Sequence, residues 1–155
     1  MRTLILFLAT GAYSGYVPVA SGTAGSLVAL PLLFVSARLL QVSALLHILV
    51  LLVAIGGACW VAGAAEQYLG EHDSSKIVVD EIVGFLSATA LLEITPTRLG
   101  IAFLLFRLFD ILKPPPARYF DQQVRGGRGV VLDDVCAGLY TNLVLRLLLA
   151  MRIVP

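Results

Sequence analysis

Charged side chains are scarce in this chain. Only 14% of its 155 residues are Asp, Glu, Lys or Arg, whereas soluble domains average about a quarter. The composition is 59% hydrophobic, with a mean hydropathy of +0.93. This balance predicts a membrane protein, and the length fits a single domain over residues 1–155. The net charge of +1, without a basic stripe interleaved with aromatic residues, argues against a nucleic-acid partner.

Cysteine and histidine are also rare, with two of each. Cys59 and Cys136 lie in apolar stretches without metal-ligand spacing, so we interpret both as buried, reduced thiols. Cys136 has neither a nearby histidine nor the arginine of a thiol phosphatase loop. His72 has Asp73 beside it but no plausible serine elbow. The sequence therefore disfavours cysteine and serine nucleophiles. His47 lies in a long apolar run and is expected to be hydrogen-bonded or interface-facing.

Long charge-free runs indicate an all-α fold, a polytopic membrane helical bundle. The first residues are interpreted as a retained helix, followed by a glycine-rich loop over residues 11–26. Residues 39–65 exceed the roughly 20 residues that cross a bilayer. The later apolar runs are shorter. Extended through their flanking charges, they predict helices over about 77–93, 97–113 and 131–151, separated by Pro96 and by "KPPPA".

Positive charge predicts the orientation of this bundle, because cytosolic connections carry an excess of Lys and Arg. One set of connections holds Lys76, Arg107, Lys113, Arg118, Arg125 and Arg128. The opposite set holds Arg38, Arg98, Arg146 and Arg152. Nearly all the acidic residues lie with the first set. We therefore expect the active site at the cytosolic membrane face.

Two adjacent acidic pairs are conspicuous in so apolar a chain. Asp80–Glu81 in "VVDEIVG" and Asp133–Asp134 in "VLDDVCAG" share an apolar pair before the acids and a small residue after them. A charge at mid-bilayer costs roughly 2.5–3.5 kcal/mol on the most lenient scale. Acids at helix N-termini gain from the helix dipole, which explains one capping acid but not two pairs. Several carboxylates in one layer suit Mg²⁺, which prefers oxygen ligands.

The sequence also contains residues suited to binding a phosphate group. Arg107, Asp110 and Lys113 are spaced i, i+3, i+6 and share a helical face. Arg binds phosphate as a planar fork and Lys as a point charge. In "SGTAGS" (21–26), glycines would let backbone N–H groups approach an anion, with Thr23 and Ser26 as hydroxyl donors. Taken alone, this segment is better explained as an ordinary turn, and "RGGRG" (125–129) is either a flexible turn or a phosphate clamp.

Together these residues resemble a known family, the phosphatidylglycerophosphatase A enzymes, which are bacterial membrane lipid phosphatases. The resemblance runs nearly end to end, through "GTAGS" (22–26), "HDSSKIVVDEIVGF" (72–85), "FRLFDILKPPP" (106–116), "YFD" (119–121) and "GGRGVVLDDVCAG" (126–138). It implies an all-helical protein of the bacterial cytoplasmic membrane. It also implies Mg²⁺-dependent hydrolysis of phosphatidylglycerophosphate to phosphatidylglycerol and inorganic phosphate.

The resemblance also assigns site residues. Asp80, Glu81, Asp110, Asp133 and Asp134 would be the metal and catalytic acids, and the phosphate side would comprise Arg107, Lys113 and the segment containing Gly22, Thr23, Gly25 and Ser26. We divide these roles further by inference. Asp80, Glu81, Asp133 and Asp134 are expected to hold the metal, Asp110, Asp133 and Arg107 to be catalytic, and Arg128 to join the phosphate side. The nucleophile is either a water activated by the metal or Asp110 itself.

Adjacent acids on a helix point about 100° apart. Asp134 is therefore expected to face the metal and Asp133 a basic residue such as Arg107 or Arg128, or a second ion. Gly138 would leave room for substrate or a close helix.

Two other functions stay open. A small proton- or cation-coupled transporter would also use intramembrane acids, and a CDP-alcohol phosphotransferase is another Asp-metal membrane enzyme, echoed here only by "PPPAR". The oligomeric state is not indicated.

Overall fold

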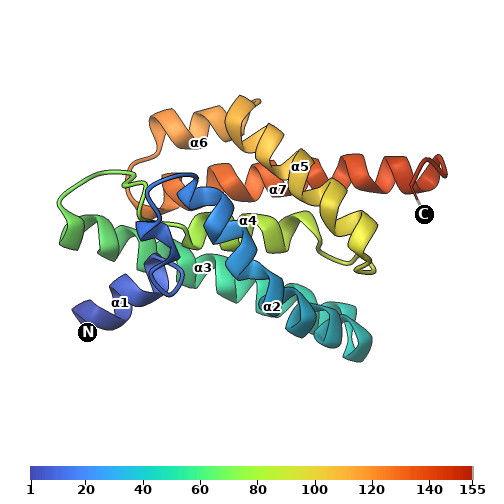
Figure 1. Cartoon of the computed structure of the whole chain (residues 1–155), viewed down its shortest axis with the longest axis horizontal. Helices are drawn as coiled ribbons and strands as arrows, with labels where there is room; N and C mark the ends of the chain where they lie inside the picture. Colours follow the sequence, from blue (N-terminus) through green and yellow to red (C-terminus); the bar gives the residue numbers. More distant parts are fainter. Residues whose placement is uncertain (155) are drawn as a thin grey trace.

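A computed structural model describes residues 1–154. Over this range the chain is all-α, with seven α-helices, one 3₁₀ turn and no strand, which confirms the predicted fold class. The helices are α1 (Arg2–Ala9), α2 (Ser21–Val42), α3 (Ala44–Leu69), α4 (Val79–Ala88), α5 (Pro96–Leu112), α6 (Ala117–Gln123) and α7 (Gly127–Ala150), and the 3₁₀ turn is η1 (Ser14–Tyr16) (Figure 1).

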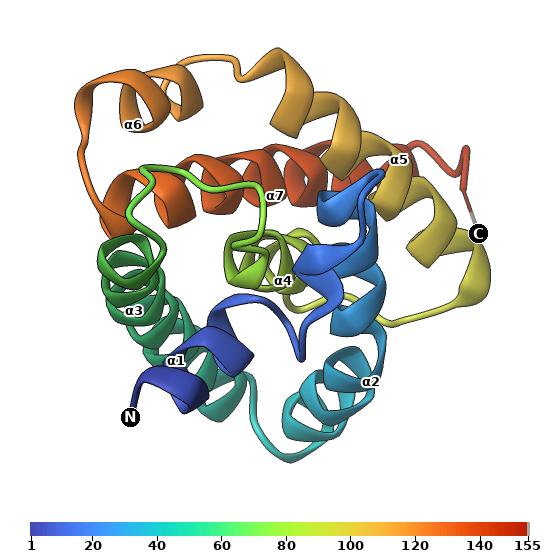
Figure 2. The ribbon, with the colours of Figure 1, turned by 60° about the vertical axis from the view of Figure 1, so that its left-hand side comes forward.

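Helix α4 lies at the centre of the bundle. Figure 2 shows it surrounded by α7, α3 and α2, with α5 and α6 beyond α7. Eight of its ten residues are buried. Phe85 on α4 packs on Phe106 of α5, and both side chains are almost fully buried. Burial of large aromatic side chains is a main source of stabilisation. The most deeply buried helix is therefore also the one that carries Asp80 and Glu81.

The helix directions bring several termini together at one end of the bundle. The end of α5 meets the first half of α7, because Lys113 bonds to Asp133. The last turns of α3 meet the start of α7, where Gly63 and Gly127 are in backbone contact. The N–H of Val78, just before α4, donates to the carbonyl of Ala9 at 2.9 Å. We call this end the acidic end, because both acidic pairs lie there.

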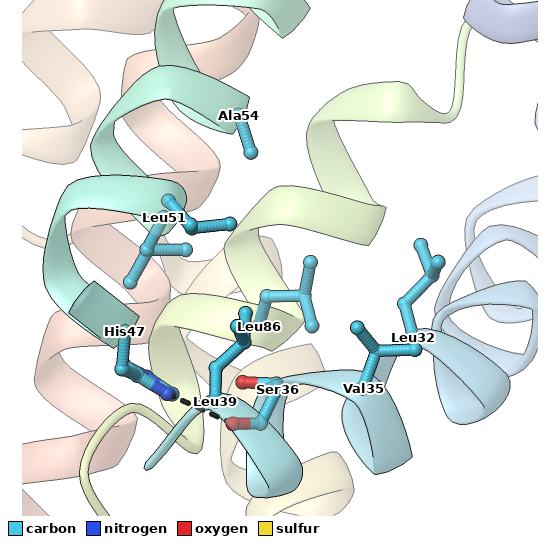
Figure 3. Close-up of a pocket in the computed structure, with 9 residues that line it drawn as sticks. Leu32, Val35, Ser36, Leu39, His47, Leu51, Ala54 and Leu86 are labelled. Atoms are coloured by element: carbon cyan, nitrogen blue, oxygen red, sulfur yellow. Dashed lines mark hydrogen bonds between the residues drawn. The ribbon is translucent and has the colours of Figure 1, made fainter. Parts of the chain in front are cut away.

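The first long apolar stretch is divided differently from the prediction. Helix α2 already begins at Ser21, inside the expected loop, and the expected span over residues 39–65 is broken at Ser43. Ser43 is extended, and its hydroxyl accepts the N–H of Leu46 at 3.4 Å, which caps α3. His47 is buried, and its Nδ1 lies 3.0 Å from the carbonyl oxygen of Ser36, which joins α3 to α2 (Figure 3). The expectation of a hydrogen-bonded histidine is confirmed.

The helix expected over 77–93 is shorter than predicted. It ends at Ala88, because side chains of α7 bind the carbonyls that a longer helix would use internally. Asn142 donates to the carbonyls of Ala88 and Ala90, and Arg146 donates to those of Ala90 and Leu91. Ten residues extend about 15 Å, roughly half the hydrocarbon thickness. Helix α4 is therefore too short to span a bilayer.

Two helices in the described range, α2 and α3, are long and apolar enough to cross a membrane by length and composition. Helix α5 matches the expected range 97–113 closely, whereas α7 begins at Gly127, four residues before the predicted start. Gly126 has a φ of +75°, which favours glycine, and leads directly into α7. Helix α6 was not predicted, and it packs on α7.

Candidate active site

The two acidic pairs come together because α4 and α7 cross at glycine. Gly84 and Gly138 each follow an acid, Asp80 or Asp134, by four residues and therefore lie on the same helical face as that acid. A Cβ added to Gly138 would lie 2.2 Å from the carbonyl oxygen of Gly84. The room left by Gly138 is thus taken by a neighbouring helix. The two glycines set the spacing between the two acid-bearing faces.

Both pairs also have the same local geometry. Oδ1 of Asp80 accepts the N–H of Glu81 at 3.0 Å, and Oδ1 of Asp133 accepts the N–H of Asp134 at 3.0 Å. Asp80 and Glu81 lie in the first turn of α4, where the helix dipole stabilises acids. Asp133 and Asp134 lie in the second turn of α7, because that helix starts at Gly127. Helix capping therefore does not account for the second pair.

Three of the acids form a cluster suited to a cation. Carboxylate oxygens of Asp80, Glu81 and Asp134 all lie within 4.8 Å of one another. Asp80 and Asp134 are 7% and 4% exposed, so water screens their mutual repulsion poorly. Glu81 Oε2 is buried and has no hydrogen-bond partner within residues 1–154. Buried carboxylates need a partner of opposite charge. The oxygen donors and the unsatisfied Glu81 atom fit a hard divalent ion.

Arg107 and Asp110 of α5 complete the cluster. Arg107 Nη1 lies 2.8 Å from Asp110 Oδ2, although its N–H is not directed along this contact and makes no hydrogen bond in the described chain. The charge of Asp110 acts on both Glu81 and Asp134, and its carboxyl group is within hydrogen-bonding range of Asp134. Asp110 is therefore a fourth carboxylate of the cluster, and the Arg107 guanidinium lies beside Asp110 and Glu81 with an unused donor.

The N-terminus of α2 faces the same cluster. The first intrahelical bond runs from the N–H of Ala24 to the carbonyl of Ala20, so the N–H groups of residues 21–23 are not used within the helix. A Cβ at Gly22 would lie 2.4 Å from Glu81 Oε1 and 2.8 Å from Arg107 Nη1. Only glycine leaves this space open between the helix terminus, the acid and the guanidinium. Such a terminus is an anion-binding arrangement.

The other members of the 21–26 segment have different surroundings. Ser26 is fully buried, and its hydroxyl donates to the carbonyl of Gly22 at 2.9 Å, so its proton is used inside the helix. Gly25 packs against Val78, which holds α2 close to the start of α4. Thr23 lies in the first turn and is half-buried. Of the predicted phosphate-binding segment, Gly22 is the residue in direct contact with the cluster.

Asp133 points away from the other acids to a different cation than predicted. Its carboxylate binds Lys113, whose Nζ also donates to Asp121 Oδ1 at 2.7 Å. Burial alone would lower the pKa of Lys113, but its hydrogen bonds to Asp121 and Asp133 raise the pKa above the ordinary value. As predicted, Asp133 faces a basic residue, but this residue is Lys113 and not Arg107 or Arg128. Asp134 lies instead with Asp80 and Glu81.

For two residues, Asp121 and Arg128, the structure differs from the prediction. Asp121 was not predicted as a site residue, although it lies in the "YFD" block, because helix α6, which positions it, was not anticipated. Arg128 is exposed at the start of α7, where it lines a separate cavity with Arg125, Glu66 and Cys59. The structure therefore does not bring Arg128 to the acid cluster. Cys59 and Cys136 are both free thiols, as expected, but each is half-buried rather than buried.

Comparison with known proteins identifies the family of this chain. The model of the phosphatidylglycerophosphatase A family matches residues 7–149. A phosphatidylglycerophosphatase A of Haemophilus influenzae is 39% identical over 141 residues, covering 90% of this chain and 85% of the relative. One from Escherichia coli is 35% identical over 133 residues, covering 85% and 76%.

A protein of Bacteroides thetaiotaomicron is 40% identical over 144 residues, covering 89% of each chain, and its name assigns it provisionally as a phosphatidylinositol-3-phosphatase. No solved structure matches this chain. The family match covers every residue of the acid cluster, all of α4 and all but the last residue of α7. The chain belongs to the phosphatidylglycerophosphatase A family of hydrolases.

Proposed function

We propose that this protein hydrolyses the terminal phosphate monoester of phosphatidylglycerophosphate, giving phosphatidylglycerol and inorganic phosphate, and that it requires Mg²⁺. The observation that carries this proposal is the contact between Gly22, Glu81 and Arg107. An acid of the cation cluster, a guanidinium with an unused donor and a helix N-terminus meet at one point. Phosphate monoester hydrolysis needs such a combination, because negative charge on the transferring phosphoryl group must be stabilised.

Asp80, Glu81 and Asp134 would hold the ion, since their oxygens lie within 4.8 Å of one another. Bound there, Mg²⁺ would supply charge neutralisation and activation of water. The repulsion among the carboxylates supports this assignment, because it is relieved by a cation. Asp133 was also expected to be a ligand. Because its carboxylate is bound to Lys113, we assign it instead to positioning that lysine and the α5–α6 connection next to Asp134.

Arg107 and the free N–H groups at Gly22 would bind the non-bridging phosphate oxygens. Asp110 holds the Arg107 side chain at 2.8 Å and lies next to Asp134. From that place Asp110 would either take a proton from the attacking water or attack phosphorus itself. In both cases the bond between phosphorus and the glycerol oxygen breaks. If Asp110 acts as the base, the oxygen of water bonds to phosphorus and its proton ends on the alcohol of phosphatidylglycerol. If Asp110 attacks, an aspartyl-phosphate would form, and its hydrolysis by water would release inorganic phosphate, restore the Asp110 carboxylate and supply the proton of the alcohol.

The substrate is taken from the names of the Haemophilus and Escherichia relatives. The name of the Bacteroides relative refers to another lipid phosphate monoester. A clustered cation site with an adjacent anion site suits either headgroup, so the two lipids should be assayed side by side. We expect phosphatidylglycerophosphate to be the better substrate.

The decisive experiment measures phosphate release from phosphatidylglycerophosphate by the purified protein, first stripped with EDTA and then supplied with Mg²⁺. Activity should be lost on stripping and restored by Mg²⁺, whereas Ca²⁺ should restore little, because it prefers more ligands and looser geometry. Full activity of the stripped protein would refute the metal assignment. Absence of phosphate release under all conditions would refute the proposed reaction.

We also propose that the protein resides in the bacterial cytoplasmic membrane with its acidic end facing the cytosol. The two apolar helices α2 and α3 support membrane residence. Basic residues lie in or beside the helix ends at the acidic end, which supports the orientation: Lys76, Lys113, Arg118, Arg125 and Arg128. Phosphatidylglycerophosphate would then approach with its headgroup at this end and its acyl chains toward the bilayer.

A further inference from the structure

A small apolar groove begins one helical turn from the acid cluster. It is lined by Ser26 and Leu30 of α2, Phe85 of α4, and Leu99, Gly100 and Phe103 of α5, and it encloses about 190 Å³. Ser26 presents no free donor to it, because its hydroxyl is bound to Gly22. Phe85 and Phe103 pack edge to face at 6.1 Å. The groove is therefore an apolar slot between α2 and α5, with α4 as its floor.

The residues that line the groove lie on the same helical faces as the site residues. Ser26, Phe85 and Phe103 are each four residues from Gly22, Glu81 and Arg107, respectively, and share their helical faces. Leu30 follows Ser26 by one turn on α2, and Leu99 precedes Phe103 by one turn on α5. Because α2 and α5 run in opposite directions, the lining residues of both helices lead away from the acidic end. At 1.5 Å per residue, the groove extends from about 6 Å to about 12 Å beyond the cluster.

We propose that this groove binds an acyl chain of the phospholipid substrate while its phosphate monoester occupies the acid cluster, an inference that rests on the proposed function. The phosphate and one chain of a single lipid would then follow one line of contacts, from Gly22 and Arg107 into the slot between α2 and α5. One wall of the slot, α2, is also one of the two helices apolar enough to lie in a bilayer.

A second apolar cavity offers an alternative path and therefore a control. It lies between α2 and α3, is lined by Gly11, Gly57 and Leu86 among others, and continues past Leu32 and Ala54 to the region of His47 (Figure 3). Gly25 of α2 packs directly on Val78 at the start of α4, next to Val79, which lines this cavity. In the α2–α5 groove, Ser26, Phe85 and Phe103 each lie one helical turn from a site residue on three different helices, so we place the acyl chain there.

Three glycines allow the groove to be filled selectively. A Cβ at Gly100, Gly57 or Gly56 would meet nothing within 4 Å, and all three lie within helices, where replacement of glycine is favourable. Gly100 lines the α2–α5 groove and Gly57 the α2–α3 cavity, whereas Gly56 lines neither. Gly100→Phe is therefore the test variant, and Gly57→Phe and Gly56→Phe are matched controls. Circular dichroism and thermal unfolding verify that each folds.

The first measurement compares kcat/KM for dioleoyl and dihexanoyl phosphatidylglycerophosphate in mixed micelles with Mg²⁺. In Gly100→Phe the long-to-short ratio should fall about tenfold, the effect of excluding roughly two methylene groups, chiefly through KM. Both control variants should stay within about twofold of the wild type. An unchanged ratio in Gly100→Phe, or a tenfold fall in Gly57→Phe instead, would overturn the proposal.

The second measurement does not depend on turnover. A phosphatidic acid with a diazirine in one acyl chain is photolysed with the full-length protein, and labelled peptides are identified by mass spectrometry. Labelling should fall on residues 96–112 in the wild type and in Gly56→Phe, and should be lost in Gly100→Phe. Labelling that persists in Gly100→Phe would overturn the groove. If the wild type hydrolyses neither phosphatidylglycerophosphate, the proposed function fails and this labelling alone decides the inference.

Discussion

Gly84 of α4 and Gly138 of α7 meet backbone to backbone, with space for no side chain between them. A Cβ at Gly138 would lie 2.2 Å from the carbonyl oxygen of Gly84, and one at Gly84 would lie 2.9 Å from that of Asp134. Asp80 and Asp134 each stand four residues before these glycines. The close crossing is therefore what allows carboxylates from two helices to share one ion.

Gly138→Ala should separate these helices. The methyl group would meet backbone, which cannot move aside cheaply, so we expect a loss of about 1–3 kcal/mol in the free energy of unfolding. Displacing the acids by about 1 Å should lower phosphatase activity on the order of 100-fold. Chemical denaturation in detergent and phosphate release measure the two effects. Gly56→Ala, at an open helical position, should be fully active and slightly more stable. Wild-type behaviour of Gly138→Ala would contradict the packing argument.

Asp134→Asn and Asp133→Asn should differ although the residues are adjacent. Asp134 lies in the cation cluster, so its replacement should lower activity by a factor of about 100 or more and remove activation by Mg²⁺, while the protein folds normally because repulsion is relieved. Asp133 binds Lys113, so Asp133→Asn should leave measurable, Mg²⁺-dependent turnover, reduced roughly 10–100-fold. Titration of activity with Mg²⁺ distinguishes them. Equal Mg²⁺ responses in the two variants would contradict the division.

Lys113→Met should destabilise the protein because it leaves Asp121 and the buried Asp133 without their cation. We expect a loss of about 1–3 kcal/mol in the free energy of unfolding. Adding Asp133→Asn should recover part of it. If the double variant is less stable than both the wild type and Lys113→Met, the proposed pairing of Lys113 with Asp133 is contradicted.

The same lysine gives a pH dependence. Its pKa is raised in the folded state above the ordinary value of 10.5. Its contribution to stability is therefore fully present below pH 10.5 and is lost as the pH rises through the raised pKa. Denaturation between pH 7 and about pH 11 measures the difference in the free energy of unfolding between the wild type and Lys113→Met. This difference should decrease only at the alkaline end. A difference that already vanishes near neutral pH would refute this assignment.

Cysteine labelling should locate the two ends of the bundle. Ser75 and Gln122 are exposed near the acidic end, whereas Thr97 is exposed at the opposite end, in the first turn of α5. In a Cys59→Ser, Cys136→Ser background, which should remain active, Ser75→Cys and Gln122→Cys should react with a membrane-impermeant maleimide only from the cytosolic side. Thr97→Cys should react only from the other side. The reverse pattern would invert the proposed orientation.

The sequence was sufficient to predict the all-α fold and most residues of the cluster. Long apolar runs between proline and glycine breaks fix the helix count approximately, because backbone hydrogen bonds must be satisfied locally in an apolar environment. Helix ends were less predictable. Ser43 breaks an uninterrupted apolar run, and α4 ends early because Asn142 and Arg146 bind its last carbonyls. The contacts of Asn142 and Arg146 join residues more than fifty positions apart, and local sequence carries no signal for them.

What the sequence by itself determined is the chemistry available: paired acids in a chain poor in charge, an arginine and a lysine on one helical face, and a glycine-rich helix start. Only the tertiary structure decided how these groups are shared. It directed Asp134 to Asp80 and Glu81, gave Asp133 to Lys113 rather than to Arg107 or Arg128, and left Arg128 in a separate cavity. The reason is physical, because a charged group pairs with the groups that lie near it in space. Here the distance between α4 and α7 is set by backbone contact at Gly84 and Gly138, and Gly22 leaves room for the side chains of Glu81 and Arg107.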